Sequence, residues 1–135
     1  MAGTFELRIV SPEGQVLKED VEFVLLPGGA GELGILPYHA PLIAELQVGI
    51  LRYTLNGANK RVALSGGFVE VADNLATVLA DTAELGEVID LDRANAAKER
   101  AERRLAQRNN EIDLRRAEFA MRKALARINA AENKK

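Results

Sequence analysis

The hexapeptide Ile89-Asp90-Leu91-Asp92-Arg93-Ala94 divides the chain into two parts with different sequence patterns. Before it, apolar residues alternate with polar ones and glycines recur, which is typical of short β-strands separated by turns. After it, the chain has no glycine or proline and is rich in Ala, Arg, Glu and Leu, which favour helix. We therefore predict a β-domain in residues 1–86 and a helical domain in residues 87–135.

The simplest interpretation of the hexapeptide is the start of a helix. Asp90 is a favourable N-cap, and Asp92 complements the positive end of the helix dipole. Ile89 and Ala94 stand at the positions of a hydrophobic staple. A nucleotide-sensing site is the alternative interpretation, and it depends on the rest of the chain.

Composition narrows the class of protein. The chain has 135 residues, enough for one domain or a small domain with an appendage, and it has no cysteine, which excludes disulfides and thiolate chemistry. No apolar run approaches the ~20 residues that span a bilayer, and no basic stretch followed by an apolar run begins the chain. We expect a cytoplasmic protein that reaches a membrane only through a partner.

The net charge of −2 conceals an asymmetry between the two parts. Residues 1–88 carry 5 Lys and Arg against 12 Asp and Glu, whereas residues 89–135 carry 13 against 8. A basic helical segment can attract the acidic domain or another acidic surface. Nucleic acid is not an expected partner, because aromatic platforms are missing and the basic residues are interleaved with Glu.

Short strands with turn signals between them fill the N-terminal part. The corners are Pro27-Gly28-Gly29, Asn56-Gly57, Gly66-Gly67 and Asp73-Asn74, of which Asn-Gly is a strong hairpin signal. The predicted strands are 4–10, 16–17, 21–26, 40–46, 49–55, 60–65, 68–71 and 75–80. This spacing favours an antiparallel sandwich or barrel, and so an α+β fold in which the sheet precedes the helices.

No group of residues resembles a catalytic centre. The glycine-rich segment 28–34 lacks the Gly-Lys-Ser/Thr ending of a phosphate loop and does not open a helix. His39 is the single histidine, without a second His or a Cys to complete a metal site. The sequence therefore predicts a protein that is not an enzyme.

After the hexapeptide, apolar residues recur at intervals of three or four, the period of an amphipathic helix. The first stripe is Leu91, Ala94, Ala97, Ala101 and Leu105. The second is Leu114, Ala117, Met121, Ala124, Leu125 and Ile128. Between them, Arg108-Asn109-Asn110-Glu111 indicates a connector, and Asp113 is the expected cap of the second helix.

Two short helices with a brief connector predict an antiparallel helical hairpin. Its stripes are mostly alanine, which allows close approach but buries little apolar area. Short helices depend on packing for most of their stability. We therefore expect a marginal hairpin that can open while each helix finds other partners.

Three segments identify a resemblance that covers essentially the whole chain. They are Ile9-Val10-Ser11-Pro12-Glu13-Gly14, Gly31-Glu32-Leu33-Gly34-Ile35-Leu36-Pro37-Tyr38-His39-Ala40-Pro41-Leu42, and Ser65-Gly66-Gly67-Phe68-Val69-Glu70-Val71. With the Ala- and Arg-rich tail, they make the chain similar to the epsilon subunit of bacterial F-type ATP synthases. The resemblance implies a β-sandwich of about ten strands that binds the gamma subunit and the c-ring. It also implies a helical hairpin that extends into the catalytic head, near the alpha and beta subunits, and then blocks ATP hydrolysis more than synthesis.

The resemblance also gives the hexapeptide a possible ligand. It matches the family's Ile/Leu-Asp-x-x-Arg-Ala motif, which in ATP-binding relatives holds the nucleotide while the hairpin is folded. It implies an ATP site, with or without magnesium, whose residues are Glu84, Ile89, Asp90, Arg93, Ala94, Arg100, Lys123 and Arg127. Lys123 stands where such relatives tend to carry arginine, so the charge is kept but the bidentate fork is lost.

The basic residues of the second predicted helix have two interpretations. Arg115, Arg116, Arg122 and Lys123 could meet an acidic surface of the beta subunits, or they could simply be solvated. Two alternatives to a nucleotide sensor also stay open: a structural coupling subunit that senses nothing, and an unrelated β-sandwich adaptor. The resemblance places the protein at the cell membrane, peripheral on the cytoplasmic side and held there by the complex.

Overall fold

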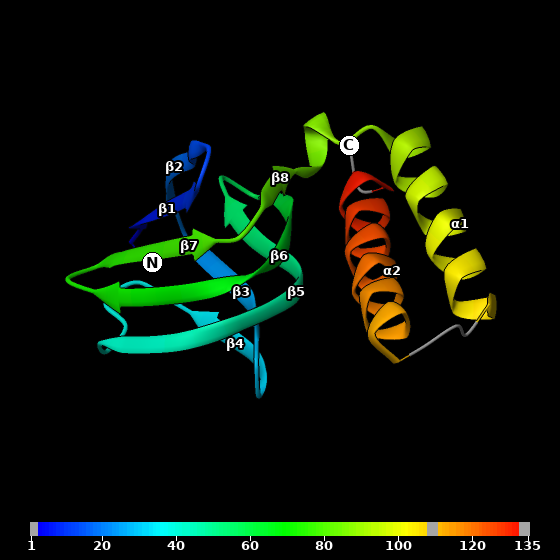
Figure 1. Ribbon diagram of the computed structural model, residues 1–135. Coiled ribbons are helices and arrows are strands. Elements are labelled where there is room, and N and C mark those ends of the chain that lie inside the picture. The colour runs from blue at the N-terminus through cyan, green and yellow to red at the C-terminus, as the bar shows by residue number, and fades with distance from the viewer. Residues whose placement is uncertain (1–2, 108–110, 133–135) are drawn as a thin grey trace.

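The computed structural model describes residues 3–107 and 111–132, in which a β-sandwich is followed by two helices (Figure 1). The strands within these residues are β1 (Phe5–Ser11), β2 (Gly14–Val21), β3 (Phe23–Gly28), β4 (Gly31–Ile35), β5 (Leu42–Leu55), β6 (Ala58–Ala72), β7 (Leu75–Ala80) and β8 (Ala83–Leu85). A 3-10 turn, η1 (Gly86–Val88), leads to helices α1 (Leu91–Gln107) and α2 (Glu111–Glu132). The predicted order, sheet first and helices second, is confirmed.

The eight strands of the described residues form one sheet that folds over its own core. Their order is β2-β1-β7-β6-β5-β3-β4, and β8 pairs with β6 beside this path. All pairs are antiparallel except β1 with β7, which is parallel. The resemblance implied about ten strands, whereas the described residues contain eight. Two pairs of the strands predicted from the sequence pattern are continuous, as β5 and β6, and two short strands, β4 and β8, were not predicted.

A bend in the middle of β6 explains the continuity. Gly66 and Gly67, which the sequence marked as a corner, have φ of 112° and 137° within the strand. A Cβ on Gly67 would lie 2.1 Å from the carbonyl oxygen of Leu79, so only glycine fits. Beyond the bend β6 pairs with β7, and before it with β8. Because of this bend, β6 contributes to both layers of the sandwich.

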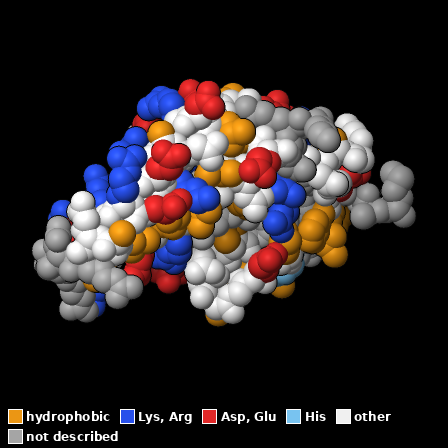
Figure 2. All heavy atoms as spheres, turned by 90° about the vertical axis from the view of Figure 1, so that its right-hand side faces the viewer, with side chains coloured by type: hydrophobic (Ala, Val, Ile, Leu, Met, Phe, Trp, Pro, Cys, Tyr) orange, Lys and Arg blue, Asp and Glu red, His pale blue; other side chains and the backbone are white. Residues whose placement is uncertain are grey.

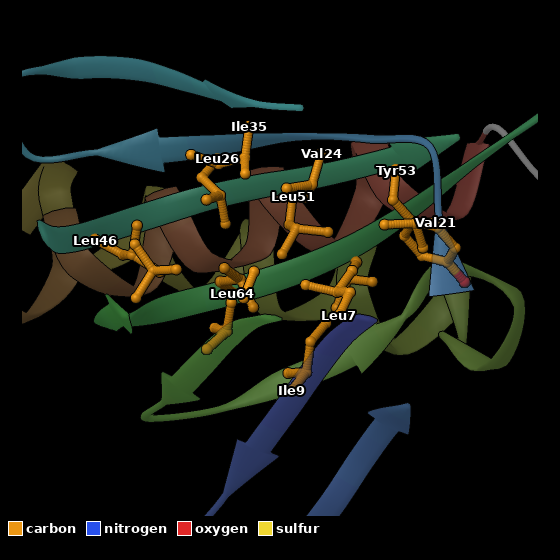
Figure 3. Close-up of a cluster of buried hydrophobic side chains, with 14 of the residues drawn as sticks. Leu7, Ile9, Val21, Val24, Leu26, Ile35, Leu46, Leu51, Tyr53 and Leu64 are labelled. Carbon is orange, nitrogen blue, oxygen red and sulfur yellow. The ribbon is translucent and has the colours of Figure 1, made fainter. Parts of the chain in front are cut away.

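The main core lies between the layers and consists of the inward-facing residues of every long strand. Figure 3 shows Leu7, Leu51 and Leu64 pointing toward one another from three different strands, and each is at most 1% exposed. The alternation of buried and exposed residues in β1 and β7 is the period-two pattern of the sequence. This core does not use the helices, which lie outside the sandwich.

The helices form an antiparallel hairpin that packs on one face of the sheet, as predicted (Figure 1). α2 lies against β5 and β6, whereas α1 packs mainly against α2. Alanines at intervals of seven are buried on the two helices: Ala94 and Ala101 on α1, and Ala117, Ala124 and Ala131 on α2. Small side chains let two helices approach closely, so the seam is tight but buries modest apolar area.

Three details of the helical prediction need correction. α2 begins at Glu111, so Asp113 lies in its first turn and is not its N-cap. Leu125, assigned to the buried stripe, is 45% exposed, because the helix turns its alanine positions toward α1 and the sheet. The predicted connector 108–111 lies outside the described residues except for Glu111, which is already helical.

Candidate functional site

The hexapeptide forms the predicted helix start. Asp90 Oδ1 accepts a hydrogen bond from the backbone N–H of Arg93 at 3.1 Å. The Asp90 carbonyl oxygen accepts from the N–H of Ala94 at 3.0 Å. Asp90 is therefore the N-cap of α1, and its side chain is exposed at the surface.

Ile89 and Ala94 lie on the inner side of this helix start. Their exposed fractions are 1% and 0%. They belong to a second apolar cluster between the sheet and the helices, whose other buried members are Ala63, Ala126, Ala130 and Ala131. The two residues thus attach the start of α1 to the end of α2, and they stand behind Asp90 and Arg93 rather than on an open surface.

Glu84 and Arg127 meet across the boundary between sheet and helix. Arg127 Nη2 donates to Glu84 Oε2 at 3.3 Å, and Arg127 Nε lies 2.7 Å from Oε1. The Nε–H bond does not point at that oxygen, so this second contact is ionic without an aligned hydrogen bond. The side chains are 35% and 17% exposed respectively, so water screens the pair only in part.

A cavity of about 410 Å³ adjoins Glu84. Lys123 of α2 lines it, one helical turn before Arg127. Its other walls come from the β1–β2 turn with the start of β2, and from the start of β8 with the residue before it. These residues are Ser11, Glu13, Gly14, Gln15, Val16, Thr82 and Ala83. Its volume is in the range of small-molecule sites.

The structure brings together three of the eight residues assigned to an ATP site by resemblance. Glu84, Lys123 and Arg127 share this corner, although they come from segments about 40 residues apart. Arg93 and Arg100 are exposed on α1, and within residues 3–107 and 111–132 no hydrogen bond or ion pair joins them to the three. Sequence reasoning missed the β1–β2 turn as a wall of the cavity, because nothing local in Ser11 or Gln15 indicates proximity to α2.

Two polar contacts and one close approach fasten the other end of α2. The guanidinium of Arg61 on β6 donates from Nη1 to the carbonyl oxygen of Asn129 at 3.3 Å, and also to Asn129 Oδ1. A Cβ on Gly86 would lie 2.5 Å from the carbonyl oxygen of Ala130. Sequence reasoning also missed Gly86, where the lack of a side chain lets η1 touch the helix.

An exposed ion pair borders this contact. Lys60 Nζ donates to Glu87 Oε1 at 2.9 Å. This hydrogen bond, followed by the charge of Glu87, raises the pKa of Lys60 above its ordinary value. The pair links β6 to η1 at the surface, where such pairs add little to stability.

Basic and acidic side chains alternate over the helical face, as Figure 2 shows. Lys98 and Glu102 lie 3.9 Å apart, and Glu99 and Arg103 lie 4.0 Å apart, both at the i,i+4 spacing. Positive and negative charges are therefore interleaved along α1.

Two kinds of feature are absent from the described part of the chain. Residues 3–107 and 111–132 contain no group of three or more His, Cys, Asp or Glu side chains that could hold a metal ion. In the same residues, neither helix is long and apolar enough to cross a membrane.

Two family models together match nearly the whole chain. Residues 4–86 match the β-sandwich domain of the ATP synthase delta/epsilon chain, and residues 87–132 match its long α-helix domain. The chain belongs to the ATP synthase delta/epsilon chain family. The resemblance inferred from the sequence segments is therefore confirmed, and with it the expectation of a non-catalytic subunit.

Curated relatives agree over their full length. The chain is 68% identical to an ATP synthase epsilon chain of Desulfitobacterium hafniense over 98% of this chain and 100% of that one. It is 54% identical to the epsilon chain of Desulforamulus reducens, with the same coverage. Family membership of this extent excludes the unrelated adaptor as an alternative.

Solved structures share the fold. A chain in the mitochondrial ATP synthase of Euglena gracilis, described as OSCP/F1/c-ring, superposes with a TM-score of 0.82. It is 24% identical, and the match covers 98% of this chain and 84% of that one. A chain in the central stalk/c-ring structure of Tetrahymena thermophila mitochondrial ATP synthase has a TM-score of 0.61 and 14% identity, covering 93% and 95%. At these identities the likeness concerns the fold alone.

Proposed function

We propose that the chain is the regulatory and coupling subunit of a proton-translocating F-type ATP synthase. In this proposal the sandwich binds the gamma subunit and the c-ring, and the helical hairpin inhibits ATP hydrolysis when it extends toward the alpha and beta subunits. The observation that carries the proposal is that the sandwich has a core of its own, whereas the helices contact it through a separate and smaller cluster. The main core includes no helical residue, so the hairpin can leave without exposing it.

The contacts of the docked hairpin fit a releasable element. The second cluster consists mainly of alanines, and each contributes less apolar area than a leucine or isoleucine. The ion pair of Glu84 with Arg127 and the hydrogen bonds from Arg61 to Asn129 supplement it. Elements that move in regulation come from the low-stability part of a structure, which suits this seam.

An exposed apolar patch supports a docking role for the sandwich. It consists of Leu36, Tyr38, Ile43, Phe68 and Leu79, which are 53% to 79% exposed. Phe68 and Leu79 are cross-strand partners on the outer face. The segment between β4 and β5, which carries Leu36 and Tyr38, lies at the end opposite to the helices (Figure 1). Exposed apolar patches mark protein interfaces, so gamma and the c-ring are assigned here.

Asn74 holds part of that patch in place. Its Oδ1 accepts from the N–H of Tyr38 at 2.8 Å, and its Nδ2 donates to the carbonyl oxygen of Thr4 at 2.9 Å. Tyr38 has φ of 62°, an uncommon value for a residue with a side chain. The restraint fixes the backbone of Tyr38, a residue that is 79% exposed, which lowers the entropy cost of binding a partner.

ATP is the proposed regulatory ligand of the docked hairpin. Lys123 and Arg127 place two cations beside the cavity, where they can meet phosphate oxygens, and Arg93 and Arg100 can add charge from α1. Asp90 can accept from the adenine amino group, with Ile89 and Ala94 supporting it from behind. Glu84 releases Arg127 when phosphate takes its place. A ligand that binds only the docked state shifts the population toward it.

Titration of the full chain with ATP and with ADP, with and without magnesium, tests the nucleotide part. We expect ATP to bind and to raise the thermal unfolding temperature. Arg93→Gln should weaken binding about tenfold or more, equal to about 1.4 kcal/mol. Arg103→Gln, on the same helix, is the matched control and should leave the affinity unchanged. Absence of binding at millimolar ATP would favour the remaining alternative, a structural coupling subunit without nucleotide sensing.

Truncation tests the regulatory part. A chain of residues 1–86 should fold alone, bind gamma and support ATP synthesis in the assembled enzyme, but it should no longer inhibit hydrolysis. Residues 87–135 would then be the inhibitory unit, with Arg115, Arg116 and Arg122 meeting acidic beta-subunit surface. Full inhibition by the truncated chain would contradict this division. The complex would hold the subunit at the cell membrane, on the cytoplasmic side.

A further inference from the structure

Two arginines lie directly opposite each other on neighbouring strands. Arg52 of β5 and Arg61 of β6 are cross-strand partners, so their side chains leave the same face of the sheet. Like charges in this position destabilise a sheet. Arg61 is bonded to Asn129, whereas the Nε of Arg52 is buried and has no hydrogen-bond partner among the described residues. An unsatisfied buried donor in a folded protein calls for an acceptor.

A cavity of about 420 Å³ lies beside Arg52, between the sheet and α2. The pairing of β3 with β5 is irregular there, and Pro27 packs so closely on Gly49 that a Cβ on Gly49 would lie 2.7 Å from the Cβ of Pro27. Leu25 pairs with Arg52 and Gly28 with Leu46, so two residues of β3 face five residues of β5. Pro27 lies in this gap, and it has no N–H to donate to a ladder. The opening is therefore part of the strand register and not a packing defect.

The lining combines cations with an apolar wall. Arg52 on the sheet and Arg122 on α2 are its basic residues, and Glu32 is its acidic one. The apolar lining consists of Pro27, Val48, Ile50, Leu125 and Ala126. Leu125 lies outside the stripe of buried alanines on α2, and it is 45% exposed beside this cavity.

We propose that this cavity binds a phosphate ester that carries an apolar or aromatic group. Arg52 and Arg122 hold the phosphate, because guanidinium groups match its oxygens in bidentate geometry. The apolar group lies on Ile50 and Leu125. Phosphate between the two arginines relieves the repulsion of Arg52 with Arg61.

The site is distinct from the proposed ATP site and does not rest on it. Lys123 and Arg127 face the cavity beside β8 and Glu84, whereas Arg122 and Leu125 line the opening beside β3 and β5. Successive helix residues point about 100° apart, so the two sets occupy different faces of α2. Because Arg52 is on the sheet and Arg122 on the helix, the bound phosphate also links the hairpin to the sandwich.

The test is a titration of the isotopically labelled full chain with phenyl phosphate, followed by NMR of the backbone amides. We expect shifts in residues 47–52 and 122–129. Arg52→Gln and Arg122→Gln should each weaken binding about tenfold or more. Arg52→Lys should retain part of the affinity, because it keeps charge without the fork. Arg103→Gln, outside the cavity, should not change it.

The same titration with inorganic phosphate and with ATP provides the comparison. Phenyl phosphate should bind more tightly than inorganic phosphate, since only the ester reaches the apolar wall. Equal affinity would overturn the assignment of an ester ligand. Shifts confined to Glu84, Lys123 and Arg127 would place phosphate in the other cavity and overturn the proposal, as would unchanged affinity in Arg52→Gln. The Arg93→Gln variant should bind phenyl phosphate normally, so failure of the ATP proposal leaves this result unaffected.

Discussion

The carboxylate of Glu84 on β8 and the guanidinium of Arg127 on α2 form an ion pair, with Oε1 2.7 Å from Nε. The pair joins the last strand of the sandwich to the second helix, across the boundary at which the sequence changes from β to helical pattern. It lies beside the cavity that Lys123 lines. The same arginine can therefore attach the hairpin to the sandwich in the free protein and, in the proposed ATP site, meet phosphate.

A double-mutant cycle measures that pair. Glu84→Gln and Arg127→Gln should each destabilise the docked hairpin, and their coupling should be about 1 kcal/mol, since the groups are partly screened. Chemical denaturation with helical circular dichroism gives the values. Phosphate competes with Glu84 for Arg127, so Glu84→Gln should bind ATP at least as tightly as the wild type. Weaker ATP binding in Glu84→Gln would show that Glu84 itself contacts the nucleotide.

Gly86→Ala should loosen the docking of α2. The new Cβ would lie 2.5 Å from the carbonyl oxygen of Ala130 and 3.1 Å from that of Arg61, so the helix must move away. We expect a loss of about 1–3 kcal/mol, typical of overpacking. Gly29→Ala is the matched control, because its Cβ would meet only an ordinary contact at 3.5 Å. Equal unfolding temperatures for the two variants would contradict a tight contact at Gly86.

Asp90 can be tested as a cap and as a ligand contact separately. Asp90→Ala should cost about 1 kcal/mol of helix stability, whereas Asp90→Ser should retain the cap. The serine side chain is too short to reach a bound base, so both variants should weaken ATP binding if the carboxylate contacts it. Circular dichroism and calorimetry provide the two readouts. Normal ATP affinity in Asp90→Ser would show that Asp90 acts only as a helix cap.

A disulfide can fix the hairpin in its docked form. Ala101 and Ala117 are 1% and 0% exposed on facing helices, so cysteines at both positions should bridge when Cα atoms come within about 7 Å. Oxidation should raise ATP hydrolysis by the assembled enzyme, and reductant should reverse this. Cysteines at Ala96, which is exposed, and Ala117 are the control and should not bridge. Full inhibition with the crosslink confirmed by mass would show that extension is not the inhibitory movement.

Tyr53 should make stability fall at alkaline pH. Burial raises the pKa of its phenol above the ordinary 10.0, with the charge of Glu19 acting in the same direction. The unfolded chain therefore loses this proton at a lower pH than the folded protein. The contribution is present below pH 10 and is lost as pH rises through the folded-state pKa. Tyr53→Phe should reduce the loss, as measured by denaturation at several alkaline pH values. An identical decline in both proteins would assign it to other groups.

Local features of the sequence determined the elements and much of their order. The alternation in Phe5–Ser11, the Asn-Gly turn and the cap at Asp90 act over a few residues, so one-dimensional patterns reveal them. The three- and four-residue spacing of apolar residues likewise indicated which helix faces meet, although Leu125 in the second stripe is exposed. The strand count could not be read in this way: Gly66-Gly67 marks a turn or a bend equally well, and only its partners in β7 and β8 decide that β6 continues.

The candidate sites depended more on tertiary structure. The hexapeptide and the basic residues of the second helix could be named from the chain alone, but not which of them meet. Glu84 reaches Arg127, and Arg52 lies opposite Arg61, through sheet register and helix docking that join residues far apart in sequence. Gly86 appeared to be one glycine among eleven until its distance to Ala130 was known. Residue types and spacings predict local conformation and helix capping. Which distant residues lie side by side is decided only when the whole chain packs.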